Sequence, residues 1–190
     1  MDTKLILTNI NKHIELNETE RIHFQSLLTE QSLPKNARLL RQGERCQHIY
    51  FVTEGILRAY YLNDEGKEST VMFAMKDWWI TDMYCFLNER PAMVNIHVVQ
   101  ACRIFCLTKK QLDALYQEIP KFNIFFRILM QNAYCREQLR MIQRLSLQAK
   151  DRYEQFVEKY PQLAMQLPLK QIASYLGVTP EFLSYLRSNR

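Results

Sequence analysis

The stretch LPLKQIASYLGVTPEFLSYLR, residues 167–187, is typical of two short helices joined by a tight turn. Pro168 suits the first turn of a helix, because the N–H that proline lacks has no partner there. Gly177 suits the left-handed position that ends this helix. Thr179 is a good N-cap for a second helix, in which Pro180 takes the first position. The spacing therefore predicts a helix-turn-helix, the motif whose second helix enters the major groove of DNA.

Apolar residues at helical spacing would hold these two helices together. They are Ile172, Ala173, Leu176, Val178, Leu183 and Leu186. Ala173 must be small, because the two helices would cross at that point. A helical hairpin unrelated to DNA can share this pattern by chance. The position of the motif behind a long helix and a β-rich segment favours the helix-turn-helix over that alternative.

Polar side chains of the same stretch are candidates for contacts with DNA. They are Lys170, Thr179, Glu181, Ser184, Tyr185 and Arg187. Glu181 can accept a hydrogen bond from a cytosine amino group, and Ser184 can reach base edges. Tyr185 and Arg187 are expected nearer the phosphate backbone, because the end of a recognition helix climbs back to the rim of the groove. Lys170 is either a phosphate contact or an ordinary surface lysine.

Residues 34–107 have a different character, with short β-type runs separated by turn signals. The clearest runs are 49–52, 56–62 and 94–99. Three of the four glycines of the chain stand at predicted turns, namely Gly43, Gly55 and Gly66. Glycine is favoured there because such turns often need a positive φ. Closely spaced strands with turns of this kind predict a β-roll or barrel.

Helical patterns flank this β-rich segment on both sides. Residues 4–31 predict two helices, the second capped by Asn17. Residues 122–147 contain no Pro or Gly and predict one long helix. A weak heptad runs along it, formed by Ile128, Cys135 and Ile142 with Phe125, Asn132 and Leu139 between them. The helix either packs on its own roll or pairs with a second copy, and a length of about 25 residues favours a dimer.

The composition is that of an ordinary globular protein. The 190 residues are 47% hydrophobic and 24% charged. No apolar run approaches the roughly 20 residues of a membrane span, and the N-terminus lacks the pattern of a secretory signal. We therefore expect a cytoplasmic protein with no membrane partner. The net charge of +5, concentrated in residues 109–190, permits a nucleic-acid partner.

The cysteines and histidines give no pattern of catalysis or metal binding. The five cysteines, at positions 46, 85, 102, 106 and 135, form no CxxC pair. Cys102 and Cys106 would share one face of a strand and are interpreted as buried thiols. The four histidines contain no HxH pair of the kind that metal-binding β-rolls use. With no Gly-rich phosphate loop and no HExxH, we predict no bound metal and no enzyme activity.

With these features together, the chain resembles the Crp/Fnr family of bacterial transcription regulators, in particular the short branch common in Bacteroidetes-type bacteria. The matching segments are 43–44, 50–55, 63–67, 78–82, 88–91 and 173–187. The resemblance implies an α+β fold: a cyclic-nucleotide-binding-type β-roll (a double-stranded β-helix or jelly roll) with flanking helices, a long dimerisation helix and a C-terminal helix-turn-helix. It divides the chain into residues 1–108, 109–147 and 148–190.

The resemblance also implies an effector pocket, formed by Trp79, Thr81, Asp82, Met83, Arg90 and Ala92. Cyclic-nucleotide binders of the family carry Gly-Glu where this chain has Thr81-Asp82, and that Glu holds the ribose. They also carry an Arg, which neutralises the cyclic phosphate, where this chain has Ala92. A buried phosphate without a charged partner is costly. The prediction is therefore no cofactor and an effector other than cyclic AMP, or an empty roll.

The predicted recognition helix departs from the family as well. Better-known members place Arg where this chain has Pro180 and Tyr185. Glu181 is retained. The sequence stops at Arg190, which leaves no room for a β-wing after the second helix, so either this branch lacks a wing or the chain is truncated. The expected partners are double-stranded DNA, a second copy of the chain and a small-molecule effector, and the alternative is a ligand-sensing module that has lost DNA binding.

Overall fold

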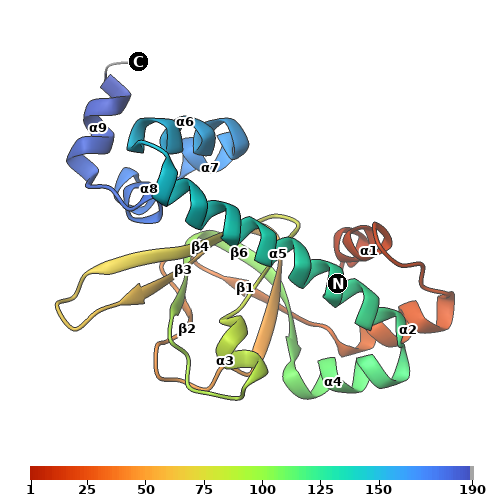
Figure 1. The fold of residues 1–190 in the computed structure, drawn as a ribbon. Coiled ribbons are helices and arrows are strands. Elements are labelled where there is room, and N and C mark those ends of the chain that lie inside the picture. The colour runs from red at the N-terminus through yellow and green to blue at the C-terminus, as the bar shows by residue number, and fades with distance from the viewer. Residues whose placement is uncertain (189–190) are drawn as a thin grey trace.

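The structure is a computed structural model, and it describes residues 1–188. Two N-terminal helices precede a β-roll, and a long helix leads from the roll to four short helices (Figure 1). The helices are α1 (Lys4–Asn11), α2 (Glu18–Leu27), α3 (Met83–Leu87), α4 (Lys109–Glu118), α5 (Lys121–Ser146), α6 (Ala149–Lys159), α7 (Pro161–Gln166), α8 (Leu169–Leu176) and α9 (Pro180–Ser188). The strands are β1 (Thr29–Leu33), β2 (Arg38–Leu40), β3 (His48–Leu62), β4 (Glu68–Met75), β5 (Trp78–Ile80) and β6 (Asn95–Thr108).

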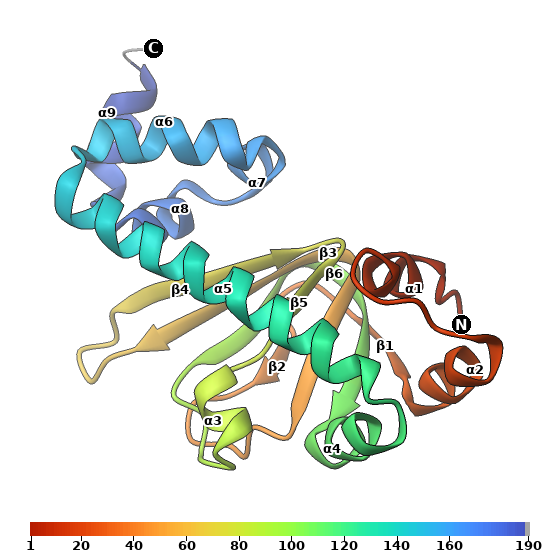
Figure 2. The same ribbon diagram turned by 45° about the vertical axis from the view of Figure 1, so that its right-hand side comes forward.

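The sheet confirms the predicted β-roll, and its strands pair in the antiparallel direction. Strand β3 is its centre and pairs with β6, β4 and β5, while β1 and β2 pair with β6. The long β3–β6 pair runs from His48 opposite Thr108 to Tyr60 opposite Asn95. Figure 2 shows the two long strands crossing the roll beneath α5.

Two details of the predicted secondary structure are wrong. Residues 29–31 are not helical but belong to β1, which pairs with residues 102–106 of β6. Gly55 does not end a strand but lies inside β3, at an irregularity of its pairing with β6. Its φ is +86°, and a Cβ there would lie 2.2 Å from the carbonyl oxygen of Ala101. Glycine is required at this position because the neighbouring backbone passes so close.

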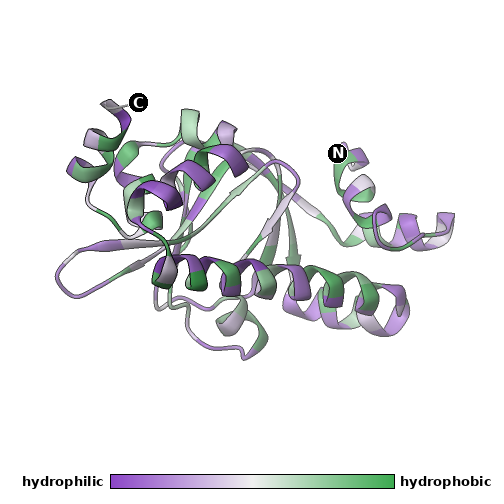
Figure 3. Cartoon of the chain, turned by 45° about the horizontal axis from the view of Figure 1, so that its top comes forward, coloured by the Kyte–Doolittle hydropathy of each residue, from purple (hydrophilic) through white to green (hydrophobic). Residues whose placement is uncertain are grey.

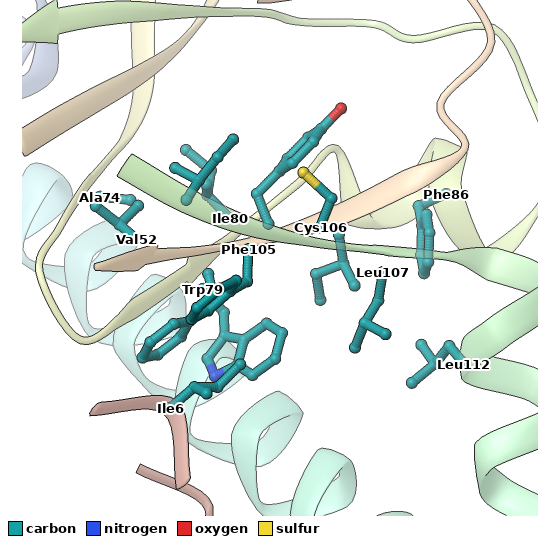
Figure 4. Close-up of a cluster of buried hydrophobic side chains, with 14 of the residues drawn as sticks. Ile6, Val52, Ala74, Trp79, Ile80, Phe86, Phe105, Cys106, Leu107 and Leu112 are labelled. Atoms are coloured by element: carbon teal, nitrogen blue, oxygen red, sulfur yellow. The ribbon is translucent and has the colours of Figure 1, made fainter. Parts of the chain in front are cut away.

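The main core fills the roll and extends under the start of α5. Figure 4 shows part of this core around Trp79. Phe122, Phe125 and Phe126 of α5 are buried against it, and the rings of Phe125 and Trp79 are 6.1 Å apart. The predicted place of Phe125 in a dimer seam is therefore wrong, because this side chain faces the roll of its own chain.

The thiols of the roll lie within this core. Cys46, Cys85, Cys102 and Cys106 are buried and form no disulfide. Burial raises the pKa of Cys102 to about 11 and that of Cys106 to about 12. Both thiols are therefore protonated near neutral pH, where they are poor nucleophiles and poor metal ligands. This agrees with the interpretation of Cys102 and Cys106 as packing residues.

The C-terminal helices form a second core that includes part of the roll. Their buried side chains pack with Ile56, Phe73 and Val99, which lie on strands of the roll. Pro161 is the first residue of α7, where a missing N–H is harmless. Among residues 1–188, no helix is long and apolar enough to cross a membrane.

Candidate DNA-recognition helices and effector cassette

The turn between α8 and α9 has the geometry that its sequence predicts. Gly177 ends α8 in the left-handed conformation with φ +71°, and its N–H donates to the carbonyl oxygen of Ala173. The hydroxyl of Thr179 accepts a hydrogen bond from the N–H of Phe182 at 3.2 Å and so caps α9. Ala173 and Leu183 are fully buried between the helices. Short-range signals therefore place α9 at a defined angle to α8.

All six predicted DNA-contacting side chains are exposed: Lys170, Thr179, Glu181, Ser184, Tyr185 and Arg187. Figures 1 and 2 both show α9 at the end of the molecule that lies farthest from α2. The side chain of Phe182 is 42% exposed beside them, although its residue type predicts burial. Sequence reasoning missed Phe182, because its only signal is its place one residue before the buried Leu183, about 100° away around the helix. The exposed side of α9 is thus polar, and it also carries the aromatic side chain of Phe182.

A polar network that the sequence did not predict joins α8 to the roll. The hydroxyl of Ser174 accepts a hydrogen bond from the N–H of Thr70 at 2.8 Å and donates to the carbonyl oxygen of Glu68 at 2.9 Å. Thr70 in turn accepts from Nε of Arg58, a side chain that is 2% exposed and pairs with Glu68 at 2.5 Å. The sequence offered one signal for this network, namely an arginine, Arg58, within the otherwise apolar run 56–62.

The predicted effector residues separate into two groups. Trp79, Thr81 and Met83 line a groove of about 230 Å³ between β5 and α5. Trp79 donates from its indole N–H to the side-chain oxygen of Asn9 at 3.0 Å, and Thr81 donates to the carbonyl oxygen of His48 at 2.8 Å. The groove is mostly apolar. Asp82, Arg90 and Ala92 do not line it.

The carboxylate of Asp82 binds backbone N–H groups of its own loop. Its carboxylate accepts hydrogen bonds from the N–H groups of Cys85 at 3.3 Å, Met93 at 2.7 Å and Val94 at 3.2 Å. The first of these bonds caps α3, and the other two close the loop that follows it. The residue is 8% exposed. A carboxylate that already holds three backbone donors has little capacity left for a ribose hydroxyl.

Arg90 and Ala92 also do not lie where the expected effector pocket requires them. Arg90 is exposed in the loop after α3. Ala92 is 3% exposed, and its backbone exchanges hydrogen bonds of 2.7 Å with Gly43 and Glu44. Arg90 therefore does not substitute in this structure for the arginine that Ala92 replaces, because its side chain faces solvent.

Comparison with known proteins supports the assignment of the roll. Residues 30–119 match the family model of the cyclic nucleotide-binding domain. The anaerobic regulatory protein of Bacillus subtilis (strain 168) is 21% identical over 89 residues, which are 47% of this chain and 37% of that protein. The chain thus matches little more than a third of this curated relative.

Solved structures share the fold over nearly the whole chain. FixK2 from Bradyrhizobium japonicum has a TM-score of 0.74 and 16% identity, covering 85% of this chain and 83% of that one. The regulator CLP of Xanthomonas campestris, described as responsive to c-di-GMP, has a TM-score of 0.70 and 12% identity, covering 91% of each chain. A putative Crp/Fnr regulator from Eubacterium rectale has a TM-score of 0.71 and 17% identity, covering 92% of this chain and 83% of that one.

Residues 30–119 therefore match the cyclic nucleotide-binding domain in both sequence and fold. A putative Crp/Fnr regulator is among the structures that share the fold, and the curated relative is a regulatory protein, in agreement with the resemblance seen in the sequence. These relatives are regulators and not enzymes.

Proposed function

We propose that this chain is a dimeric, sequence-specific DNA-binding regulator whose roll senses an effector other than cyclic AMP. The observation that carries the proposal is the α8–α9 pair, in which a glycine turn and a buried seam leave the polar side of α9 exposed. This arrangement matches what a recognition helix needs in order to enter the major groove. Selection of binding sites from random DNA tests the proposal. Recovery of no enriched sequence would favour a sensor module without DNA binding.

The exposed side of α5 supports a symmetric dimer. Ile142 is 52% exposed, Leu145 83% and Ile124 45%, although all three are apolar. Residues 124 and 145 are three heptads apart, and Ile142 lies one turn from Leu145 on the same side. Figure 3 shows apolar and polar residues alternating along the length of α5. Pairing two such helices would cover these side chains and place two recognition helices about 34 Å apart, one turn of DNA.

Cyclic AMP is expected to bind weakly or not at all. Ala92 offers no charge to the phosphate, and Asp82 already holds the backbone donors of the loop. Loss of a charged partner for a buried phosphate costs about 2–5 kcal/mol. Titration calorimetry of the full chain should therefore detect no binding in the low-micromolar range. A low-micromolar dissociation constant that persists after Arg144→Gln, a change outside the roll, would refute this prediction.

Two substitutions on α9 are expected to change DNA binding in different ways. Glu181→Ala should relax the preference at one base pair by about 1–3 kcal/mol, because the acid reads a base edge. Arg187→Ala should weaken binding to all sequences alike and lower the salt slope by about one unit, because it removes one phosphate contact. Fluorescence anisotropy with selected and scrambled DNA at several salt concentrations measures both effects.

Matched controls keep the comparison specific. Glu15→Ala and Lys35→Ala remove the same charges at exposed positions of the N-terminal half, far along the chain from α9. Both should leave affinity and salt slope unchanged. Equal effects of Glu181→Ala on every sequence would show that Glu181 does not read a base.

A further inference from the structure

A second cavity, outside the roll, lies where α5, α6 and α8 meet. Its volume is about 370 Å³, within the range of about 300–1,000 Å³ that is usual for small-molecule sites. Figure 2 shows the end of α5 passing beneath α6 and beside α8 at this place. We call it the hinge cavity, because it lies between α5, which leaves the roll, and the C-terminal helices α6 and α8.

The wall of the hinge cavity is strongly basic. Five cationic side chains line it against the single acid Glu158: Arg136, Arg140, Arg144, Arg152 and Lys159. Such a concentration of like charge is unfavourable unless an anion is bound or the charges are well solvated.

Two of these cations already have partners. Arg140 pairs with Glu137 at 2.6 Å and donates to the carbonyl oxygen of Val71 at 2.8 Å, and its guanidinium lies 4.8 Å from the ring centre of Tyr175. Arg136 pairs with Glu137 at 3.6 Å. One acid, Glu137, therefore serves both arginines.

The other three cations have no acidic partner among residues 1–188. Arg144, Arg152 and Lys159 form no ion pair there. Arg152 donates from Nη1 to the carbonyl oxygen of Leu147 at 2.7 Å, but its Nε is buried without a hydrogen-bond partner. A buried guanidinium N–H without an acceptor is costly, so an anion that drew the Arg152 side chain toward the cavity would relieve this cost.

Aromatic rings complete the wall. Phe156, Tyr160 and Tyr175 line the hinge cavity together with the cations. Burial raises the pKa of the Tyr175 phenol, so this group stays a neutral donor. Cations already lie over two of these rings, Arg140 over Tyr175 and Lys159 over Tyr160 at 5.4 Å. A planar heterocycle can pack against ring edges and guanidinium planes together, and guanidinium groups bind phosphate oxygens in pairs.

We propose that the hinge cavity binds a small phosphate monoester that carries a planar ring. A terminal phosphate supplies three acceptor oxygens and two negative charges for Arg144, Arg152 and Lys159, while the ring lies against the aromatic wall. The backbone of duplex DNA is a poorer match, because the rings have no role on a phosphate backbone and the cations surround a concave space. A bound ligand would connect α5 with α6 and so fix the C-terminal helices relative to the roll.

Calorimetry on the full chain without DNA tests the proposal independently of DNA recognition. The probes are AMP, GMP, inorganic pyrophosphate, adenosine and cyclic AMP. At least one monophosphate should bind, with pyrophosphate, adenosine and cyclic AMP each about tenfold or more weaker, because each lacks the ring, the phosphate or the dianion.

Substitutions inside and outside the hinge cavity test whether the monophosphate binds there. Arg144→Gln and Lys159→Gln lie on different helices, and each should weaken binding of the monophosphate about tenfold or more. Arg127→Gln, an exposed change on α5 outside the hinge cavity, should have no effect. Ala133→Phe, which narrows the groove of the roll, should also leave binding intact.

Two results would overturn the proposal. Loss of binding with Ala133→Phe but not with Arg144→Gln would place the ligand in the roll. Absence of binding by every monophosphate at about 1 mM, a concentration that detects even very weak ligands, would mean that the hinge cavity takes no such molecule. If Arg144→Gln then weakened DNA binding, these cations would serve the DNA backbone instead.

Discussion

Replacing Ile142 with Asp is expected to convert the protein from dimer to monomer and to weaken operator binding about a hundredfold or more. In a symmetric pair of α5 helices, each copy would bring a carboxylate into the seam. Burying an unpaired charge there costs several kcal/mol. The side chain is 52% exposed in the single chain, so the substitution should not disturb the core. Each monomer would then reach only one half of a two-fold operator, which removes the gain from binding both halves at once.

Light scattering at tens of micromolar, together with anisotropy on operator DNA, measures both effects. Ile22→Asp is the matched control, because Ile22 is 57% exposed on α2 and distant from the proposed seam. That variant should remain dimeric and bind DNA normally. A monomeric wild-type protein at the same concentration would contradict the dimer itself, whatever Ile142→Asp does.

Replacing Asp82 with Ala is expected to destabilise the roll by about 3 kcal/mol, because three backbone N–H groups at the α3 loop lose their acceptor together. For a chain of this size, the melting temperature should fall by roughly 6–12 °C. Thermal unfolding followed by circular dichroism measures the change. Asp64→Ala, an exposed substitution in the turn between β3 and β4, should change the melting temperature little.

The Asp82 experiment also separates two roles for this carboxylate. If Asp82 serves the effector and not the loop, Asp82→Ala should leave stability unchanged and abolish binding of whatever ligand the roll accepts. A large loss of stability without ligand supports the role that the hydrogen bonds indicate. Asp82→Asn keeps one acceptor oxygen and should be less damaging than Asp82→Ala.

The local geometry of the α8–α9 pair could be predicted because its signals act over a few residues. The capping of α9 by Thr179 and the end of α8 at Gly177 each involve partners within five residues. The predictions that failed concerned distant partners. Phe125 fits a heptad by spacing, yet it turns toward Trp79, which lies 46 residues earlier in the chain. Spacing along a helix shows which residues share a face, but not what covers that face.

The effector cassette illustrates the same division. The sequence shows that Asp82 stands where nucleotide binders of the resembled family place a ribose-binding acid. Only the fold reveals that Asp82 binds the N–H groups of Met93 and Val94, because loop closure brings residues eleven and twelve positions away within 3.2 Å. The hinge cavity could not be predicted from the sequence for a related reason. Its cations come from α5 and α6, and they face one another only after the chain turns at Leu147.

By itself the sequence determined the order of the parts: paired N-terminal helices, a β-roll, a long helix and a helix-turn-helix. Periodicity, proline, glycine and capping residues act locally, so they can be recognised without knowing the partner segment. Tertiary structure alone decided the strand pairing of β1, the bulge at Gly55 and the docking of Ser174 on Thr70 and Glu68. These features depend on contacts between segments up to about a hundred residues apart, and the energy of such contacts is set by packing and backbone approach that no local pattern encodes.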